Sequence, residues 1–229
     1  MKFISLVLTA LFSIPVMAFQ LNPMSATIEL SENKKSVNFV IENDTKQPLP
    51  VQISLFHRQV KENGEDILLE TNELSAFPDQ LIIPPEQKRS VKVTWSGNKS
   101  DVKVEKSFRF VAEQLPLNLQ KGEEKSGVKM LLKYVASLYV NPQGSKPNVS
   151  CTYSDLKLHC ENKGNKHQLL FFNSLILSDN KSTIKLSEED LKKINGENTL
   201  AQSKRSFNLS FKKELNNLKK PVKLNYKFE

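Results

Sequence analysis

The sequence predicts an all-β protein, and three observations carry this prediction. Short apolar runs alternate with polar residues at the period of a β-strand. Turn-forming residues separate these runs about every 10 to 15 residues. No stretch of the sequence shows the period of a convincing helix. At 229 residues, the chain is long enough for two domains that each bury their own core.

An export signal is expected at residues 1–18. Lys2 supplies a positive charge, residues 4–15 form an apolar core, and Val16-Met17-Ala18 matches a cleavage site of small residues. The apolar run is too short for a membrane anchor, and no later stretch approaches 18 apolar residues. We therefore expect a mature chain that starts at Phe19 and does not insert into a membrane.

Residues 19–142 are expected to form an immunoglobulin-like β-sandwich of about seven strands. Apolar alternation bounded by proline, asparagine and aspartate defines most of them. The expected strands are residues 21–30 (broken by Pro23), 37–41, 51–56, 81–83, 90–95, 108–115 and 128–141. Residues 57–80 are polar and expected to be mostly loop, with a short strand at 67–69, and residues 117–126 form a charged loop.

The last strand of this set is unusually long and has one apolar face. Its sequence, GVKMLLKYVASLYVNP, covers residues 127–142. The apolar face comprises Val128, Met130, Leu132, Tyr134, Ala136, Leu138 and Val140. About 13 residues at roughly 3.4 Å each span about 44 Å, twice a typical strand. Such a strand extends beyond one small sheet, so part of its apolar face is expected to cover a second domain or a partner.

Beyond a linker at residues 141–147, residues 148–229 are expected to form a smaller, more polar β domain. Its strand candidates are residues 156–158, 168–172, 175–177, 183–186, 207–211 and 222–226. The segment Ser187-Glu188-Glu189-Asp190-Leu191 has the spacing that caps a short helical turn. Cys151 and Cys160 are the only cysteines of the chain. An even, closely spaced pair in an exported protein predicts a disulfide.

Charge and motifs argue against nucleic acid and against catalysis. The formal net charge is +8, or +7 without the signal, and the basic residues are spread along the chain rather than interleaved with aromatic residues in one cluster. The three histidines, His57, His159 and His167, do not form an HExxH spacing, and no GxSxG or phosphate-binding glycine loop occurs. We expect no enzyme activity, no cofactor and no metal.

Several segments in a fixed order resemble a known family. They are FQLNPM, PVQISLFHR, FPDQLIIPPEQKRSVKVTW, EKSFRFVAEQLPL and GVKMLLKYVASLYVNP. They are similar to the first domain of periplasmic pilus-assembly chaperones of the chaperone–usher pathway, the PapD-like family. The segment LKLHCENKGNKHQLL resembles the opening hairpin of that family's second domain. The segments LIIPP, RFVAEQLP and GVKMLLKY resemble the sequences of the archaic branch of the family more than those of the classical branch.

The resemblance implies two immunoglobulin-like domains arranged as an L, located in the periplasm. It also implies a mechanism: the long strand is lent to a pilin subunit that lacks its last strand, and the subunit is then released at the outer-membrane usher. By position, the donor residues are Val128, Met130 and Leu132, with Tyr134 as a fourth candidate. Alternate side chains of an added strand fill the partner's groove while its backbone pairs with the partner's edge.

The resemblance further implies that basic residues in the interdomain cleft anchor the subunit's C-terminal carboxylate. The candidates here are Lys133, Lys129, Arg89 and Arg109. The chain departs from the family pattern, because residues 19–33 contain no basic residue and Ser137 stands near the position of the usual lysine. Glu113 matches an acidic position of the family, but Val140 and Asn141 stand where its arginine partner is expected, which puts the family's interdomain ion pair in doubt.

Two other functions fit an exported β-sandwich. One is a secreted immunoglobulin-like adhesin or interaction module, and the other is a hydrolase whose carboxylates come together only in the fold. A chaperone would trap an unstable pilin in a one-to-one complex, whereas an adhesin would not. The free chaperone is also a candidate for self-association, because an exposed apolar strand invites pairing.

Overall fold

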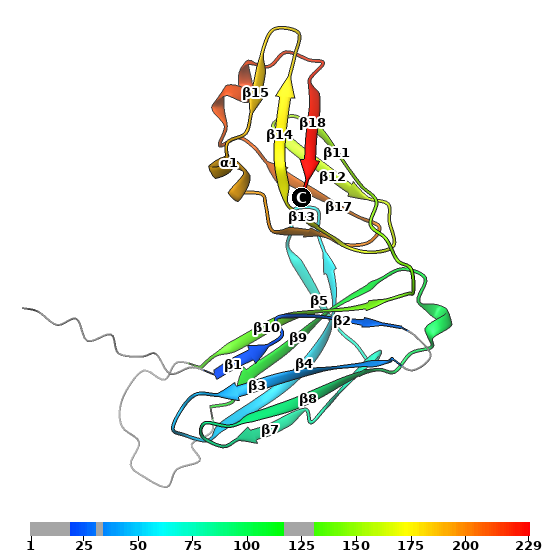
Figure 1. The fold of residues 1–229 in the computed structure, drawn as a ribbon, viewed down its shortest axis with the longest axis vertical. Coiled ribbons are helices and arrows are strands. Elements are labelled where there is room, and N and C mark those ends of the chain that lie inside the picture. Colours follow the sequence, from blue (N-terminus) through cyan, green and yellow to red (C-terminus); the bar gives the residue numbers. More distant parts are fainter. Residues whose placement is uncertain (1–18, 31–33, 117–130) are drawn as a thin grey trace, which may run out of the picture.

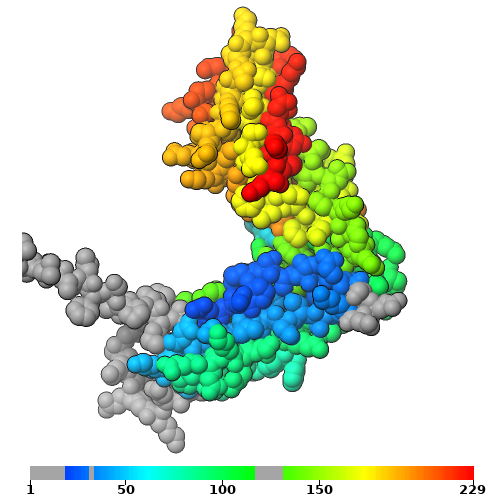
Figure 2. All heavy atoms as spheres, viewed as in Figure 1, coloured from blue at the N-terminus to red at the C-terminus, as the bar shows by residue number. Residues whose placement is uncertain are grey.

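The computed structural model describes residues 19–30, 34–116 and 131–229. The chain forms two β-sandwich domains that meet at an angle (Figure 1). The space-filling view shows a hollow between the upper domain and the lower one (Figure 2). The expected export signal and part of the long strand lie outside the described residues. Within the described ranges, the structure contains no helix of the length and apolarity needed to cross a bilayer.

The first domain consists of two packed sheets. Its strands are β1 (Phe19–Asn22), β2 (Ser25–Glu29), β3 (Ser36–Asn43), β4 (Leu49–Val60), β5 (Asp66–Glu70), β6 (Leu74–Phe77), β7 (Gln80–Ile83), β8 (Lys88–Trp95), β9 (Lys106–Gln114) and β10 (Lys133–Asn141). One sheet has the order β1-β3-β8-β6, and the other has the order β2-β10-β9-β4-β5, with β7 also paired to β4. The break at Pro23 that the sequence predicted separates β1 from β2, and the structure adds that the two strands belong to different sheets.

A single apolar core fills the space between these two sheets. Phe39 of one sheet stacks on Phe110 of the other with ring centroids 4.1 Å apart. Alternate residues of β10, namely Ala136, Leu138 and Val140, are fully buried in this core. Their burial explains why the even-numbered face of the long strand is apolar: from residue 136 onward it packs inside its own domain.

The second domain is smaller and has its own core. Its elements are β11 (Val149–Ser154), β12 (Lys157–Asn162), β13 (Gln168–Leu170), β14 (Phe172–Ser178), β15 (Thr183–Lys185), α1 (Glu188–Lys192), β16 (Glu197–Thr199), β17 (Ser203–Asn208) and β18 (Lys223–Phe228). They form sheets β11-β12-β17, β13-β16 and β15-β14-β18. Ser187 caps α1 through the reciprocal hydrogen bonds of a capping box with Asp190, as its spacing predicted. We propose the domain boundaries at residues 142 and 148, between the two cores.

Two expectations about the first domain were wrong. Residues 57–80 are not mostly loop, because β4 continues to Val60 and β5, β6 and β7 follow. The polar residues that indicated a loop lie partly in the turns at residues 61–65 and 71–73 and partly in the strands themselves. In the strand expected over residues 128–141, Leu131 and Leu132 are described but lie outside β10, which covers Lys133–Asn141; residues 128–130 lie outside the described part of the chain.

The predicted disulfide joins Cys151 to Cys160. The two residues face each other directly in the β11–β12 hairpin, and both are buried. A cross-link over nine residues restricts the unfolded chain and is expected to contribute about 2.5 kcal/mol. Replacing both cysteines by alanine should lower the free energy of unfolding of the second domain by about this amount. Urea unfolding of the oxidised protein and the double variant measures it, and equal midpoints would contradict the assignment.

The β4–β5 hairpin reaches from the first domain to the second (Figure 1). The backbone N–H of Ser206 in β17 donates to the carbonyl of Glu62 at 2.9 Å, and Ser206 Oγ bonds to the Glu62 carboxylate. His159 Nδ1 lies 3.5 Å from the same carboxylate. Gly64 sits at the hairpin turn against the buried guanidinium of Arg205, with a φ of +97°. The hairpin therefore braces the angle between the domains.

Gly64→Val should release this brace. A side chain at residue 64 would overlap the Arg205 guanidinium and would also strain the positive φ. We expect a wider distribution of interdomain angles in small-angle X-ray scattering, with both domains still folded. Gly196→Val is the matched control, because Gly196 also has a positive φ of 84° but no neighbouring atom within 4 Å. If both variants scatter like the parent, the hairpin does not set the angle.

Candidate functional site

Within the described residues, the first part of β10 has a strand partner on one edge only. On one side β10 pairs with β9 along its length. On the other side the pairing with β2 starts only at Ser137, and the N–H of Ser137 donates to Met24 O at 3.0 Å. Leu132 O accepts from Gln114 N–H on the β9 side, so alternate residues from 132 point their backbone groups toward β9. Lys133 and Val135 consequently direct N–H and C=O away from β9, where no strand of the described chain pairs with them.

Two of the four predicted donor side chains are described, and both touch their own domain. Leu132 is half-buried and packs against the core of the first domain. Tyr134 also packs there, in an edge-to-face contact with Phe19 at 4.7 Å between ring centroids. Val128 and Met130 lie outside the described residues. The structure therefore places Leu132 and Tyr134 at the end of the sandwich, next to the unpaired edge.

Arg109 is the one anchor candidate that the structure places in a polar cluster on the cleft side. It lies on the face of the second sheet that turns away from the core, and its Nη1 donates to Ser137 Oγ at 2.6 Å. Its Nε and Nη2 donate to Asp66 Oδ2 at 3.0 and 2.6 Å, and Arg58 Nε donates to Asp66 Oδ1 at 2.9 Å. Two arginines thus share one carboxylate.

Electrostatics keep this carboxylate ionised. Partial burial pushes the pKa of Asp66 upward, but hydrogen bonds from Arg109 and Arg58 and their positive charges outweigh this effect and hold the pKa below its ordinary value. Among the hydrogen bonds of the described residues, the Arg58 side chain donates only through Nε, to Asp66. The two terminal nitrogens of Arg58 form the fork that suits a second carboxylate.

The other candidates are placed less favourably. Lys133 forms an ion pair with Glu113 of the neighbouring strand at 3.1 Å, and both side chains are about half-exposed. Arg89 lies at the start of β8, in the other sheet and at the end remote from the second domain, and it donates only to the adjacent Lys88 carbonyl among the described bonds. Lys129 lies outside the described residues.

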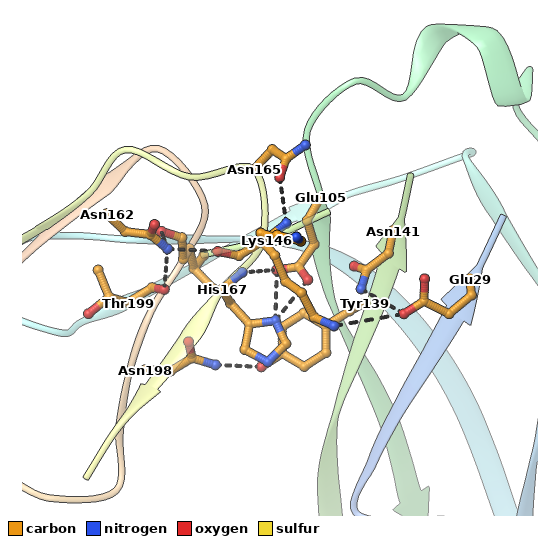
Figure 3. A network of polar contacts seen from close by, with 12 residues as sticks. Glu29, Glu105, Tyr139, Asn141, Lys146, Asn162, Asn165, His167, Asn198 and Thr199 are labelled. Carbon is orange, nitrogen blue, oxygen red and sulfur yellow. Dashed lines mark hydrogen bonds and ion pairs between the residues drawn. The ribbon is translucent and has the colours of Figure 1, made fainter. Parts of the chain in front are cut away.

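The interdomain junction uses other residues than the family pattern implies. Glu105 in the first domain accepts from the backbone N–H of His167 at 3.0 Å, and His167 Nδ1 lies 2.8 Å from its second oxygen (Figure 3). The His167 ring stacks on Tyr139 of β10 with centroids 3.9 Å apart. Tyr139 OH accepts from Asn198 Nδ2 at 2.6 Å. Because Glu113 pairs with Lys133 instead, it makes no contribution to this junction.

Sequence reasoning missed Arg58, Asp66 and Glu105. The signal for Arg58 was present, since Ile53, Leu55 and His57 alternate with outward-facing residues and the pattern continues to residue 58. Asp66 and Glu105 had no comparable signal. Their roles depend on partners 43 and 62 residues away along the chain.

Comparison with known families identifies the chain. A family described as "Pili and flagellar-assembly chaperone, PapD N-terminal domain" matches residues 20–146, more than half of the sequence. The chain belongs to this family. Its members are assembly chaperones, and the match gives no support to the adhesin and hydrolase alternatives. Curated protein sequences contain no match to the chain.

Solved structures share the two-domain fold at low sequence identity. The complex of the chaperone CsuC with the tip subunit CsuE, from archaic Csu pili of Acinetobacter baumannii, has a TM-score of 0.56 at 19% identity over 84% of this chain and 91% of the other. The E. coli chaperone DraB gives 0.57 at 13% identity, over 93% and 91%. The SafA pilin–SafB chaperone complex of Salmonella enterica gives 0.58 at 12% identity, over 86% of each chain.

Among the residues described here, no group of three or more His, Cys, Asp or Glu side chains is arranged to hold a metal ion.

Proposed function

We propose that this pilus-assembly chaperone works in the periplasm by donor-strand complementation. In this proposal it binds a pilin subunit that lacks one strand, stabilises it, and delivers it to an outer-membrane usher. The assignment to the archaic branch is part of the proposal and rests on the amino-acid sequence of residues 81–85, 109–116 and 127–134.

The observation that carries the proposal is the unpaired edge of β10 at Lys133 and Val135. An incoming strand can form main-chain hydrogen bonds there, because these residues point N–H and C=O away from β9. The apolar residues Val128, Met130 and Leu132 precede this edge in the chain and alternate with a period of two. Burying three or four such side chains in a subunit groove would contribute roughly 5–10 kcal/mol before the cost of ordering is subtracted.

The basic cluster supplies the anchor in this proposal. We assign Arg109, assisted by Arg58, to the subunit's C-terminal carboxylate. Both arginines lie on the same outward face of the sheet as Ser137, where the family's lysine is expected. Lys133 is a secondary candidate on that face, because its ammonium group already forms an ion pair with Glu113 at 3.1 Å. Arg89 does not have this role in the proposal, because it lies at the remote end of the other sheet.

The names of similar proteins support the choice of partner. CsuC forms a pre-assembly complex with a tip subunit, and SafB forms a complex with a pilin. A periplasmic location agrees with the expected signal at residues 1–18. Self-association of the free chaperone through the same edge would compete with subunit binding.

Co-expression tests the proposal. A pilin subunit lacking its last strand should be degraded or aggregate when produced alone, and should accumulate as a soluble one-to-one complex when this chain is exported with it. Size-exclusion chromatography with light scattering measures the stoichiometry. Unchanged recovery of several such subunits, with and without the chain, would count against a chaperone role.

A further inference from the structure

Apart from Lys146 in the linker, the net positive charge of residues 19–229 lies in the second domain. Residues 19–142 contain 16 Lys and Arg and 16 Asp and Glu, whereas residues 148–229 contain 15 basic and nine acidic residues. The first domain is therefore neutral and the second carries a formal charge of +6. The proposed donor edge and carboxylate anchor lie in the neutral domain, so they do not account for this charge.

Part of this charge lies on one surface, the outer face of the β15-β14-β18 sheet. Figure 2 shows β14 in yellow beside β18 in red on the visible side of the second domain. Strand register brings eight residues to this face: Thr183, Lys185, Ser174, Ile176, Ser178, Lys223, Asn225 and Lys227. The opposite face of the sheet carries Leu175 and Leu177, which are buried in the core.

None of the eight residues on this outer face is acidic, and the nearest acidic residue along β18 is Glu229, just beyond the end of the strand. Lys185, Lys223 and Lys227 are exposed, and none of them forms an ion pair within the described part of the chain. The adjoining turn adds Lys181 and Lys219. Asp179 in this turn accepts hydrogen bonds from the backbone N–H groups of Lys219, Lys181 and Ser182, which lower its pKa. Asp155 nearby pairs with Lys220 at 3.2 Å.

The geometry of the lysines indicates the kind of partner. Lys223 and Lys227 are four residues apart on one strand, which separates them by about 13 Å, and Lys185 lies two strands away, at about 10 Å. No single carboxylate or phosphate bridges such distances, so the partner must present several negative charges over a surface. Lysines suit this diffuse attraction, whereas arginine forks suit individual anions.

The composition of the face favours lipid over protein. Protein interfaces depend on aromatic or arginine anchors in well-packed pockets, and this face has neither: its one apolar side chain, Ile176, is half-buried at the centre. Lysine clusters on a soluble domain are attracted to anionic headgroups. We propose that the outer face of the β15-β14-β18 sheet binds anionic phospholipid membranes peripherally. This binding involves no insertion and leaves the β10 edge free.

Vesicle sedimentation tests the proposal with the mature chain. The protein should sediment with vesicles containing about 30% phosphatidylglycerol at about 50 mM salt, but not with pure phosphatidylcholine, and should be released at about 300 mM salt. The variant Lys185→Gln/Lys223→Gln/Lys227→Gln should bind roughly 100-fold more weakly. The control Lys46→Gln/Lys92→Gln/Lys99→Gln removes the same charge from exposed positions of the first domain and should bind like the parent.

Three results would overturn the proposal. One is a parent protein that does not sediment with the anionic vesicles. The second is an equal loss in both triple variants, which would mean that net charge alone matters. The third is binding to soluble polyglutamate but not to vesicles, which would identify an acidic protein as the partner. The chaperone proposal is independent of all three, because subunit co-purification does not involve this face.

Discussion

Val135→Pro should abolish the complex with a pilin subunit while leaving the chaperone folded. Proline removes the backbone N–H, and the N–H of residue 135 points to the unpaired edge rather than to β9. Proline is tolerated at such edge positions, because no hydrogen bond within its own sheet is lost. The partner strand, in contrast, loses a main-chain hydrogen bond and meets the pyrrolidine ring within the new pairing. We expect the yield of co-purified subunit to fall at least tenfold.

The control for this variant is Val135→Thr, which retains the N–H and a β-branched side chain. Circular dichroism and thermal unfolding should show that both variants remain folded, and only the proline variant should fail to retain the subunit. A proline variant that still recovers the subunit in full would show that the pairing edge lies elsewhere. In that case the donor-strand proposal for Lys133 and Val135 would have to be abandoned.

The architecture could be predicted from the sequence because it depends on a local signal. Alternation with a period of two indicates a strand without knowledge of its neighbours, and Pro23 indicates the break between β1 and β2. The length of the last strand could not be predicted in this way. Leu132 continues the alternation of Ala136, Leu138 and Val140, but it is only partly buried against the core and lies outside β10. The first residue of β10 depends on the strands that pair with it, and alternation does not indicate where these strands lie.

The anchor cluster shows the same limit for the site. Arg109 was one of four basic candidates, and the sequence offered no means to rank them. The structure separates them by sheet and by partner: Arg89 belongs to the other sheet, Lys133 pairs with Glu113, and Arg109 joins Arg58 around Asp66. This information arises from pairing between strands that are distant in the chain, and strand alternation alone does not contain it.

Arg109→Met should weaken subunit binding by about 2–3 kcal/mol, and the loss should depend on the subunit's C-terminal carboxylate. Methionine keeps much of the side-chain volume but removes all five donors. Asp66 is not left without a partner in this variant, because Arg58 Nε still donates to it at 2.9 Å. The chaperone should therefore remain folded, which thermal unfolding verifies. Arg89→Met is the matched control and should bind the subunit like the parent.

A double-mutant cycle connects the arginine to the carboxylate. A subunit extended by a few residues at its C-terminus carries its carboxylate away from the cleft. In binding to the parent chaperone, this extension should lower the affinity about as much as Arg109→Met does. In binding to the Arg109→Met variant, it should lower the affinity little further, because the two changes remove the same interaction. Competition binding with purified complexes measures the four affinities. Additive losses would mean that Arg109 does not bind the carboxylate; the assignment would then pass to Arg58 or Lys133, whose methionine variants can be placed in the same cycle.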